Sequence, residues 1–344
     1  MSRVRNSNIE LLRIIAALMV FMLHYNDPVL WGGDNSAVLD SMSSVSICAV
    51  NVFVIITGYF SCMSYSRNVG KISNLLIQLI FYRLLFHSIA NILNNRPILS
   101  LNELIGCVIP NNYFVILYLT LFLISPYINK LITCLSKNDY KKMLIFFFIL
   151  FSIIPFVVDI LFFSVGPKYS EGLSTVSLRG GDFGYNIINF SLLYIIGAYL
   201  RIHSIKLRNR QNFFGFIIAS CFVYFGYEIE TKLSTSANVT FGYHSPFVIL
   251  QAMFLFMFFS KLKFKSGAVN ELSKAAFTCY LIQSYFLGHL RITYFINQQP
   301  YITMLHEIGS AIIIYLLSYV AYKIYNQTLG RVTDRITYSI NYYE

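Results

Sequence analysis

The sequence predicts an all-α polytopic membrane protein, a bundle of about ten transmembrane helices with both termini in the cytoplasm. Of the 344 residues, 56% are hydrophobic and only 12% are charged, whereas soluble proteins carry about 25% charged residues. The apolar residues form long blocks, which membrane helices require. Basic residues gather on alternate sides of these blocks. We expect residues 1–344 to form a single transmembrane domain without a separate soluble domain.

Ten apolar stretches are close to the about 20 residues that cross a bilayer. They lie at residues 9–27, 45–66, 72–94, 113–134, 143–164, 185–203, 212–229, 245–262, 272–291 and 304–323. The first stretch shows no signal-peptide cleavage site, so we expect it to be retained.

Three segments between the stretches have a composition of their own. Residues 28–44 are expected to form an irregular loop because of their Asp and Gly content. Residues 99–110 alternate apolar and polar positions and predict a short helix on the membrane surface. Residues 166–184 contain five glycines and predict a long loop, which is often a functional element.

The net charge of +11 reflects membrane topology, and no nucleic acid partner is expected. With the N-terminus inside, 19 of the 26 Lys and Arg residues lie on the cytoplasmic side, five lie outside, and Arg13 and Arg83 lie within spans. This asymmetry follows the positive-inside rule. Losing or adding one span would scramble the alternation, so the pattern supports an even count. Six scattered cysteines without a C-x-x-C pair indicate neither a metal site nor a disulfide framework.

The first span carries Glu10, Arg13 and His24 among apolar neighbours. Eleven residues turn a helix by about 1100°, close to three full turns, so Arg13 and His24 share one face about 16 Å apart. Ionisable side chains at this depth usually face a bundle interior or a watery cavity, and histidine suits proton transfer near neutral pH. The alternative is structural: Glu10 and Arg13 form an ion pair near the cytoplasmic edge, and His24 bonds to a neighbour.

The second span contains the polar residues Asn51 and Thr57 in an apolar helix. The Thr57-Gly58 pair allows a neighbouring helix to approach closely. That packing role alone could explain why the pair is present.

The third span carries Arg83, His87 and Asn91 at intervals of four residues, which places them on one face. Arg83 lies near the middle of the membrane, where its charge cannot easily reach the surface. It either pairs structurally with a helix terminus or with Glu10, or it lines a site for an anionic ligand.

Arg13 and His24 together form an R-x10-H pattern, and Asn51–Phe60 contains Thr57-Gly58-Tyr59. These features resemble the acyltransferase-3 family of integral membrane O-acyltransferases, whose second span ends in Ser-Gly-Tyr. The resemblance continues in order over nearly the whole chain, through Tyr113–Asn129, Leu193–Tyr199 and Leu272–Ile282.

The chain departs from the family pattern at two positions. Thr57 stands in place of serine and keeps the hydroxyl, and Gln283 stands where the family commonly has histidine. The periplasmic hydrolase-like domain of some relatives is also absent, so we expect a stand-alone membrane unit or one with a separate partner.

The resemblance implies transfer of an acyl group, typically acetyl, to a hydroxyl of a surface polysaccharide or lipid-linked oligosaccharide. The donor would be cytoplasmic acetyl-CoA, a substrate rather than a permanently bound cofactor, and no metal is expected. The resemblance also implies a multi-pass protein of the bacterial inner membrane, in contact with its lipids.

By the same resemblance, Arg13 and Arg83 would bind the donor, with Glu10 orienting Arg13. His24 would act as a general base or carry the acyl group transiently. The supporting residues would be Asn51, Thr57, Tyr59, His87 and Gln283.

Three other functions fit parts of the sequence. A transporter or flippase for a lipid-linked sugar would also need intramembrane arginines, but no histidine spaced from one. A glycan polymerase would place its catalytic residues in outer loops, where Arg179 and Asp182 are the best candidates. The third alternative is a relative without catalytic activity. Gln283, which stands where the family commonly has histidine, gives it slight support.

Overall fold

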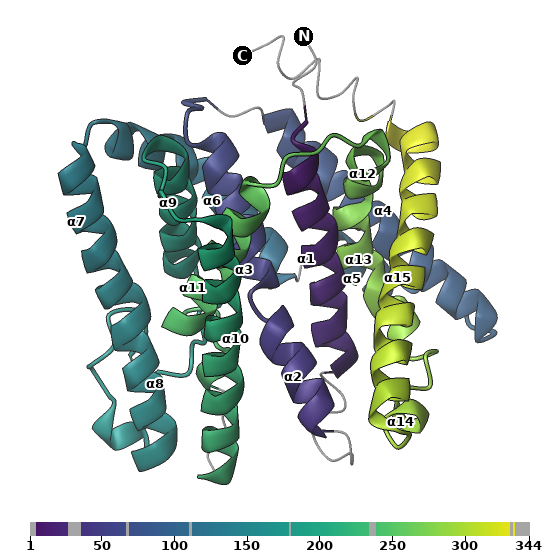
Figure 1. Ribbon diagram of the computed structural model, residues 1–344. Helices are drawn as coiled ribbons and strands as arrows, with labels where there is room; N and C mark the ends of the chain where they lie inside the picture. The colour runs from purple at the N-terminus through teal and green to yellow at the C-terminus, as the bar shows by residue number, and fades with distance from the viewer. Residues whose placement is uncertain are drawn as a thin grey trace.

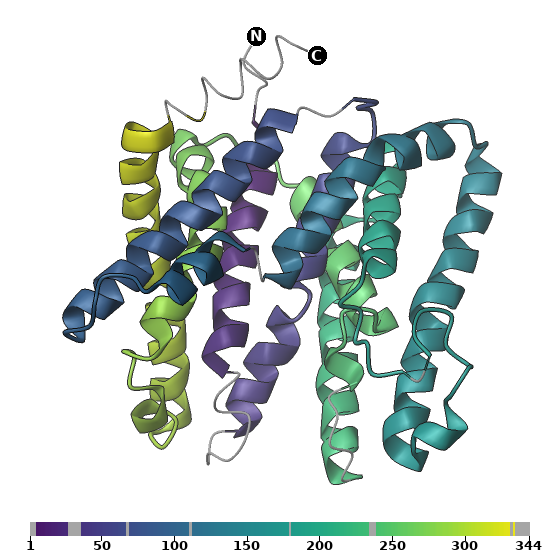
Figure 2. The same cartoon turned by 180° about the vertical axis from the view of Figure 1, so that it is seen from behind.

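The chain folds into helices that run back and forth between two ends (Figures 1 and 2). The computed structural model describes residues 5–26, 36–66, 69–109, 112–178, 180–233, 239–330 and 333. Within these ranges there is no β-strand, and eight helical segments are long and apolar enough to cross a membrane. The prediction of an all-α polytopic membrane protein is therefore confirmed.

Fifteen α-helices lie in the described ranges. They are α1 (Ser7–Asn26), α2 (Ser36–Ser46), α3 (Ala49–Ser61), α4 (Val69–Leu93), α5 (Leu101–Val108), α6 (Tyr113–Thr133), α7 (Lys137–Phe148), α8 (Ile154–Val165), α9 (Ile187–Ile202), α10 (Asn209–Lys232), α11 (Pro246–Ser260), α12 (Gly267–Leu272), α13 (Ala276–Leu287), α14 (Ile292–Phe295) and α15 (Pro300–Tyr325). A π-helical turn, Ile149–Ile153, joins α7 to α8.

Each of the ten predicted spans overlaps helix, and eight of them lie mostly in the eight long apolar segments. The other two spans, 185–203 and 272–291, contain shorter helices. The helix α9 has 16 residues and α13 has 12, less than the roughly 20 that cross a bilayer alone. The helix α5 lies where a short helix is expected, and a capping box between Ser100 and Glu103 starts it. In the loop after α8, the described residues hold one short 3₁₀ turn, Pro167–Tyr169.

The expectation of an irregular loop over 28–44 is wrong for its second half. Residues 36–46 form α2, and residues 27–35 lie outside the described ranges. Leu39 is fully buried and packs with Phe21 and Tyr25 of α1. Tertiary packing thus overrides the weak helix propensity of the serines and the aspartate in this segment.

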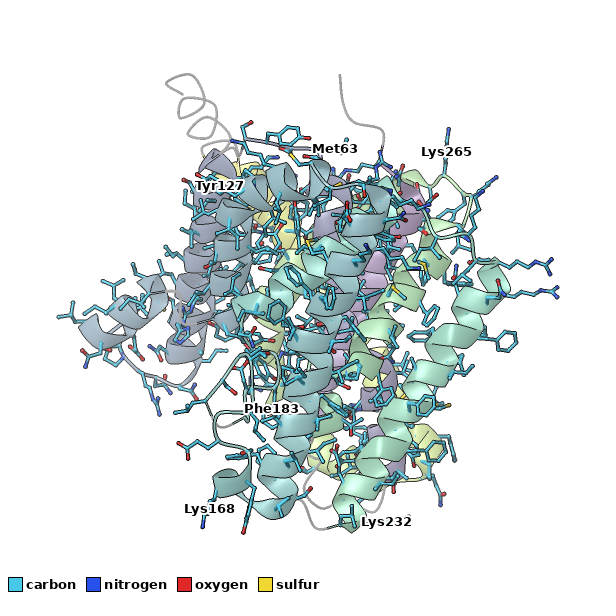
Figure 3. The ribbon with its side chains drawn as sticks, turned by 90° about the vertical axis from the view of Figure 1, so that its left-hand side faces the viewer. Met63, Tyr127, Lys168, Phe183, Lys232 and Lys265 are labelled. Carbon is cyan, nitrogen blue, oxygen red and sulfur yellow. The ribbon has the colours of Figure 1, made fainter. Side chains whose placement is uncertain are left out.

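Lysines that the sequence assigns to the two sides of the membrane lie at opposite ends of the bundle. The helix α1 begins and α15 ends at the same end (Figure 1). Lys265 lies at that end together with Met63 and Tyr127, whereas Lys168 and Lys232 lie at the opposite one (Figure 3). We call the first the basic end. The positions of these three lysines agree with the sides to which the sequence assigns them. That the basic end faces the cytoplasm stays a prediction.

Two glycines bring α3 and α9 into backbone contact. A Cβ on Gly58 would lie 2.1 Å from the Tyr194 carbonyl oxygen, and a Cβ on Gly197 would lie 2.2 Å from the Ile55 carbonyl oxygen. Neither position therefore accepts a larger residue without moving the helices apart. The prediction that the Thr57-Gly58 pair permits close helix approach is confirmed.

Candidate active site

Two cavities lie end to end inside the bundle, and the same five helices, α1, α3, α4, α6 and α13, contribute to both. The Arg13 cavity, nearer the basic end, has a volume of about 510 Å³. The His24 cavity has a volume of about 390 Å³. Both fall within the range of about 300–1,000 Å³ that is usual for small-molecule sites.

One face of α1 runs through both cavities. The residues on this face are spaced by four, three and four positions: Arg13, Ala17, Val20 and His24. Because a helix turns once in about 3.6 residues, this spacing keeps the side chains in line. This is the shared face that the R-x10-H spacing predicts.

Glu10 fixes the position of the Arg13 guanidinium. Arg13 Nη1 donates to both carboxylate oxygens of Glu10, at 3.2 and 3.3 Å. Glu10 is buried, and its Oε2 also accepts from the Ser273 hydroxyl at 2.6 Å and lies 3.8 Å from Arg5 Nη1. The Arg13 side chain remains 35% exposed, so it is oriented by Glu10 and still open to the cavity.

Further cations line the Arg13 cavity. Arg5, Lys71 and Lys274 all belong to it. Lys274 Nζ lies 2.6 Å from Glu271, whose other carboxylate oxygen lies 2.5 Å from Lys323 Nζ. Hydrogen bonds from these two lysines lower the pKa of Glu271 to about 2. The acid therefore stays ionised at neutral pH and holds Lys274 beside the cavity.

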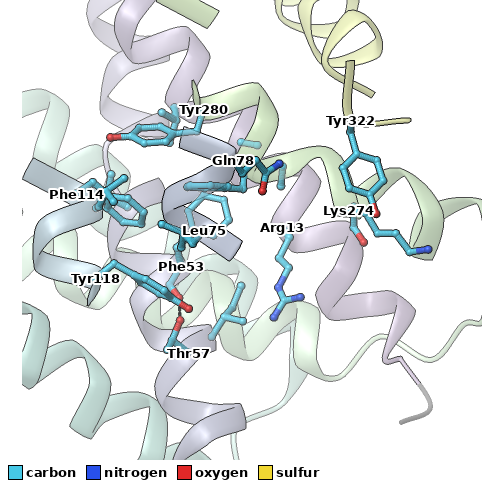
Figure 4. Close-up of a pocket in the computed structure, with 18 of the residues that line it drawn as sticks. Arg13, Phe53, Thr57, Leu75, Gln78, Phe114, Tyr118, Lys274, Tyr280 and Tyr322 are labelled. Atoms are coloured by element: carbon cyan, nitrogen blue, oxygen red, sulfur yellow. Dashed lines mark hydrogen bonds between the residues drawn. The ribbon is translucent and has the colours of Figure 1, made fainter. Parts of the chain in front are cut away.

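Aromatic side chains form the opposite wall of the Arg13 cavity. Figure 4 shows Arg13 facing Phe53, Phe114 and Tyr118. Thr57 lies next to them on α3, and its hydroxyl donates to the Phe53 carbonyl oxygen at 2.8 Å. The cavity thus combines charge on one side with an apolar surface on the other, which suits a ligand with an anionic head and an apolar arm.

The His24 cavity is polar and aromatic. His24 is an exposed side chain in its wall. The His87 Nδ1 atom lies 2.9 Å from the Tyr285 hydroxyl and 3.0 Å from the Arg83 carbonyl oxygen. Arg83 Nη1 donates to the Ile109 carbonyl oxygen at 2.8 Å. These contacts fix two basic side chains of α4 in the same cavity as His24.

The two cavities meet at Val20, Val50 and Tyr280, which belong to both linings. The Tyr280 hydroxyl donates to the Asn112 side-chain oxygen. The Tyr280 ring contacts Phe114 edge-on, with 5.3 Å between ring centroids. A fixed aromatic ring and two small aliphatic side chains therefore separate Arg13 from His24.

A buried polar cluster anchors the end of α1 just after His24. Asn26 Nδ2 donates to the Leu39 carbonyl oxygen at 3.3 Å, to the Ser43 hydroxyl at 2.9 Å and to Glu307 Oε1 at 3.2 Å. Asn26 and Glu307 are both fully buried. These bonds join α1 to α2 and α15, so they restrict movement of the turn that carries His24.

Comparison with known proteins identifies the class of the chain. A profile of acyltransferase family 3, described as an acyltransferase domain, matches residues 6–323. The chain belongs to the acyltransferase-3 family. No curated protein and no solved structure matches it. Family membership makes the chain a multi-pass membrane acyltransferase. The matched segment includes every described residue that lines the two cavities except Arg5.

Most of the predicted site residues of this acyltransferase line one cavity or the other. They are Arg13 and Thr57 in the first, and His24, Arg83, His87 and Gln283 in the second. Three others lie outside both linings. Glu10 lies beside Arg13 and accepts hydrogen bonds from its guanidinium. Asn51 is buried and donates to the Tyr243 carbonyl oxygen at 2.9 Å, and the Tyr59 hydroxyl accepts from Arg201 at 3.4 Å.

The structure separates Arg83 from Arg13, although the sequence suggests one donor surface for both. Arg13 lies six residues after the start of α1, and Arg83 lies 14 residues after the start of α4. Both helices start at the basic end (Figures 1 and 2). At about 1.5 Å per residue, Arg83 lies about 12 Å farther along its own helix than Arg13 lies along α1, and it lines the His24 cavity.

Several residues of this acyltransferase site are not singled out by the sequence analysis. Tyr280 stands at the junction of the cavities, and Tyr243 and Tyr285 line the His24 cavity. Tyrosines are common in membrane proteins because they gather at the two membrane surfaces. Residue type alone therefore does not distinguish these three from the others. A signal exists for Tyr280, because it lies three residues before Gln283 on one helix face. Glu307 also has one, as an acid inside the apolar stretch 304–323.

Of the two outer-loop residues considered for a polymerase, only Asp182 is among the described residues, and it lines no comparable cavity. Arg179 lies outside the described residues. Asp182 lines a hollow of only about 10 Å³ together with Asp159 and His244, whose side chains lie 3.3 Å apart. A hollow of that size is at the limit for a single water molecule and cannot hold a sugar.

Proposed function

We propose that this acyltransferase moves an acetyl group from cytoplasmic acetyl-CoA to a hydroxyl of a surface or lipid-linked polysaccharide. The donor would occupy the Arg13 cavity and the acceptor would occupy the His24 cavity. The basic end would face the cytoplasm, in agreement with the positive-inside rule, and the host membrane would be the bacterial inner membrane.

The observation that supports the proposal is the meeting of two cavities along one face of α1. Each contains one half of the R-x10-H pair, and they share Val20, Val50 and Tyr280. A donor from one side and an acceptor from the other can therefore meet inside the membrane. A transporter or flippase has no need of two cavities with different chemistry.

The Arg13 cavity suits the parts of an acyl-CoA. Phosphate groups bind guanidinium and ammonium groups, which Arg5, Lys71 and Lys274 supply toward the basic end. The apolar side chains of Phe53 and Phe114 would contact the pantetheine arm. The distance of about 16 Å between Arg13 and His24 along α1 is comparable with the length of such an arm.

At the junction, the acceptor hydroxyl would attack the thioester carbonyl carbon. A C–O bond forms and the C–S bond breaks, while the hydroxyl proton passes to His24 and then to the departing CoA sulfur. In the covalent variant of this scheme, a His24 nitrogen attacks the thioester, so a C–N bond forms and the C–S bond breaks as CoA leaves as the thiolate. The sugar hydroxyl then attacks the acyl carbon, the C–N bond breaks, and the hydroxyl proton passes to the released CoA thiolate. Both routes require the His24 imidazole, which lies one helical turn beyond Val20 on α1.

The His24→Ala variant tests the proposal. It should abolish acetylation of the host's surface polysaccharide, measured by mass spectrometry of the glycan, while the protein still inserts in the membrane. The control is His289→Ala, which removes an exposed histidine that lies outside the lining of either cavity and should leave acetylation unchanged. Normal acetylation by His24→Ala would refute the proposed mechanism.

A further inference from the structure

The lining of the His24 cavity favours negative charge. Arg83 and His87 lie one turn apart on α4, and both belong to it. Among the described residues, this lining includes no aspartate and no glutamate. An arginine inside a membrane is costly to place, and such residues mark the sites and pathways of ligands. The cavity is therefore suited to an anion.

Glu103, an acid on the neighbouring α5, is engaged elsewhere. Its Oε2 accepts from the backbone N–H and the hydroxyl of Ser100, at 2.7 and 2.8 Å. Its Oε1 accepts from Asn91 Nδ2 at 3.2 Å. Because these bonds close the capping box of α5, the carboxylate stays at the start of that helix.

Arg83 is held in the cavity wall by short contacts. It donates to the Ile109 carbonyl oxygen, and its own carbonyl oxygen lies 3.0 Å from the His87 ring. A guanidinium carries five N–H donors in a fork that matches a carboxylate or a phosphate. The position and the shape of the group thus both fit an anionic ligand.

Gln283 adds a group that lacks a partner. It is only 2% exposed, lines the His24 cavity, and its Oε1 has no hydrogen-bond partner in the described part of the chain. A buried acceptor without a donor costs free energy, which a ligand hydroxyl would recover. Tyr113, Tyr243 and Tyr285 supply aromatic surface in the same cavity.

We propose that the acceptor carries a negatively charged group, a carboxylate or a phosphate, close to the hydroxyl that receives the acyl group. Arg83 and His87 bind this group, and Gln283 accepts a hydrogen bond from a sugar hydroxyl. The proposal rests on the assignment of the His24 cavity to the acceptor. Two sources share this chemistry, the carboxylate of an acidic sugar and the diphosphate of a lipid carrier.

Thermal unfolding of the full chain in detergent tests the proposal with two pairs of probes. Methyl glucuronide is compared with methyl glucoside, and farnesyl diphosphate is compared with farnesol. Ligands that bind only the folded state raise the unfolding midpoint, and we expect a rise of about 2–4 °C with at least one anionic probe and none with its neutral counterpart. A rise with the glucuronide identifies an acidic sugar, and a rise with the diphosphate alone identifies the lipid carrier.

Matched variants assign the rise to one cavity. Arg83→Gln should lose it, and Arg83→Lys should keep part of it because the charge remains. Arg13→Gln should keep it, since Arg13 belongs to the other cavity. If Arg83→Gln does not fold, the other two variants decide. A smaller rise of the unfolding midpoint in Arg83→Lys, together with an unchanged rise in Arg13→Gln, also assigns the anion to the His24 cavity.

Three results would overturn the proposal: equal shifts with anionic and neutral probes, no shift with any probe, or a shift that is lost in Arg13→Gln but kept in Arg83→Gln. Failure of the proposed function has a different signature. His24→Ala should keep the anion-dependent shift while it loses acetyl transfer. The parent protein can show the anion-dependent shift while His24→Ala still acetylates the glycan. That result would support an anionic ligand in the His24 cavity and would reject the proposed mechanism of transfer.

Discussion

At the scale of single residues, the ion pair of Glu10 and Arg13 shows how a buried acid can fix the position of a cation at a cavity. Glu10 lies behind Arg13 and is held by the Ser273 hydroxyl, and Arg13 alone of the pair lines the cavity. Charge-assisted hydrogen bonds of this kind are worth about 1.5–3 kcal/mol when they are well shielded. Because Arg13 is about a third exposed, the lower part of that range applies.

We therefore predict that Glu10→Gln raises the KM for acyl-CoA roughly tenfold and changes kcat less. The amide keeps the size of the side chain but loses the charge that fixes the guanidinium. Steady-state kinetics of purified protein would measure the two constants. The control is Asp139→Asn, which neutralises an exposed acid outside the lining of either cavity. An unchanged KM in Glu10→Gln would show that Arg13 needs no orienting partner.

The sequence alone indicates the shared face of Arg13 and His24 because helix geometry is periodic. It does not reveal that Val20 lies between two cavities, because cavities arise from side chains of five helices that meet in space. For the same reason the depth of Arg83 is predicted, but its separation from Arg13 is not. Apart from its place one helical turn before Gln283, nothing in the sequence distinguishes Tyr280 among 26 tyrosines.

At the scale of elements, the contact of α3 with α9 supports the site from outside. The helix α3 supplies Val50 and Thr57 to the cavities and packs its other side on α9 through Gly58. The hydrophobic pattern predicts both helices, and the Thr57-Gly58 pair predicts that a neighbour approaches closely. The partner is not predictable, because any apolar helix with a small residue would fit.

We predict that Gly58→Ala lowers the unfolding midpoint by about 5–10 °C, because its Cβ would overlap the Tyr194 carbonyl oxygen. Thermal unfolding in detergent would measure the change. Gly309→Ala in α15 is the control, since a Cβ there meets no atom within 4 Å. Alanine in a helix gains about 0.5–1 kcal/mol over glycine, so this variant should be as stable as the parent or more so. Equal midpoints for the two variants would refute the close contact.

At the scale of the whole molecule, the bundle places two chemically different cavities in series between its ends. The Arg13 cavity is cationic and aromatic, whereas the His24 cavity combines histidines, tyrosines and Arg83. In the proposed mechanism, only the acyl end of the pantetheine arm would have to reach past the junction at Val20, Val50 and Tyr280. This arrangement would keep the nucleotide end of CoA in the Arg13 cavity and the glycan in the His24 cavity.

We predict that larger residues at Val20 block acyl transfer and spare donor binding. Val20→Leu should reduce transfer partly, and Val20→Phe should reduce it about 100-fold, as small misplacements of reacting groups can do. Binding of acyl-CoA should remain near the parent value, because the cations that hold its phosphates lie in the Arg13 cavity. Transfer to glycan and equilibrium binding of labelled acyl-CoA would be measured on the same preparations.

A bulky residue can also act by disturbing the fold, so the comparison needs a variant of the same kind away from the junction. Ile116→Phe on α6 provides it, since Ile116 is 45% exposed and lies outside both linings. This variant should transfer like the parent. Loss of binding and transfer together in Val20→Leu would show that the donor site itself has been damaged. Normal transfer in a folded Val20→Phe protein would mean that the acyl group does not travel between the cavities along α1.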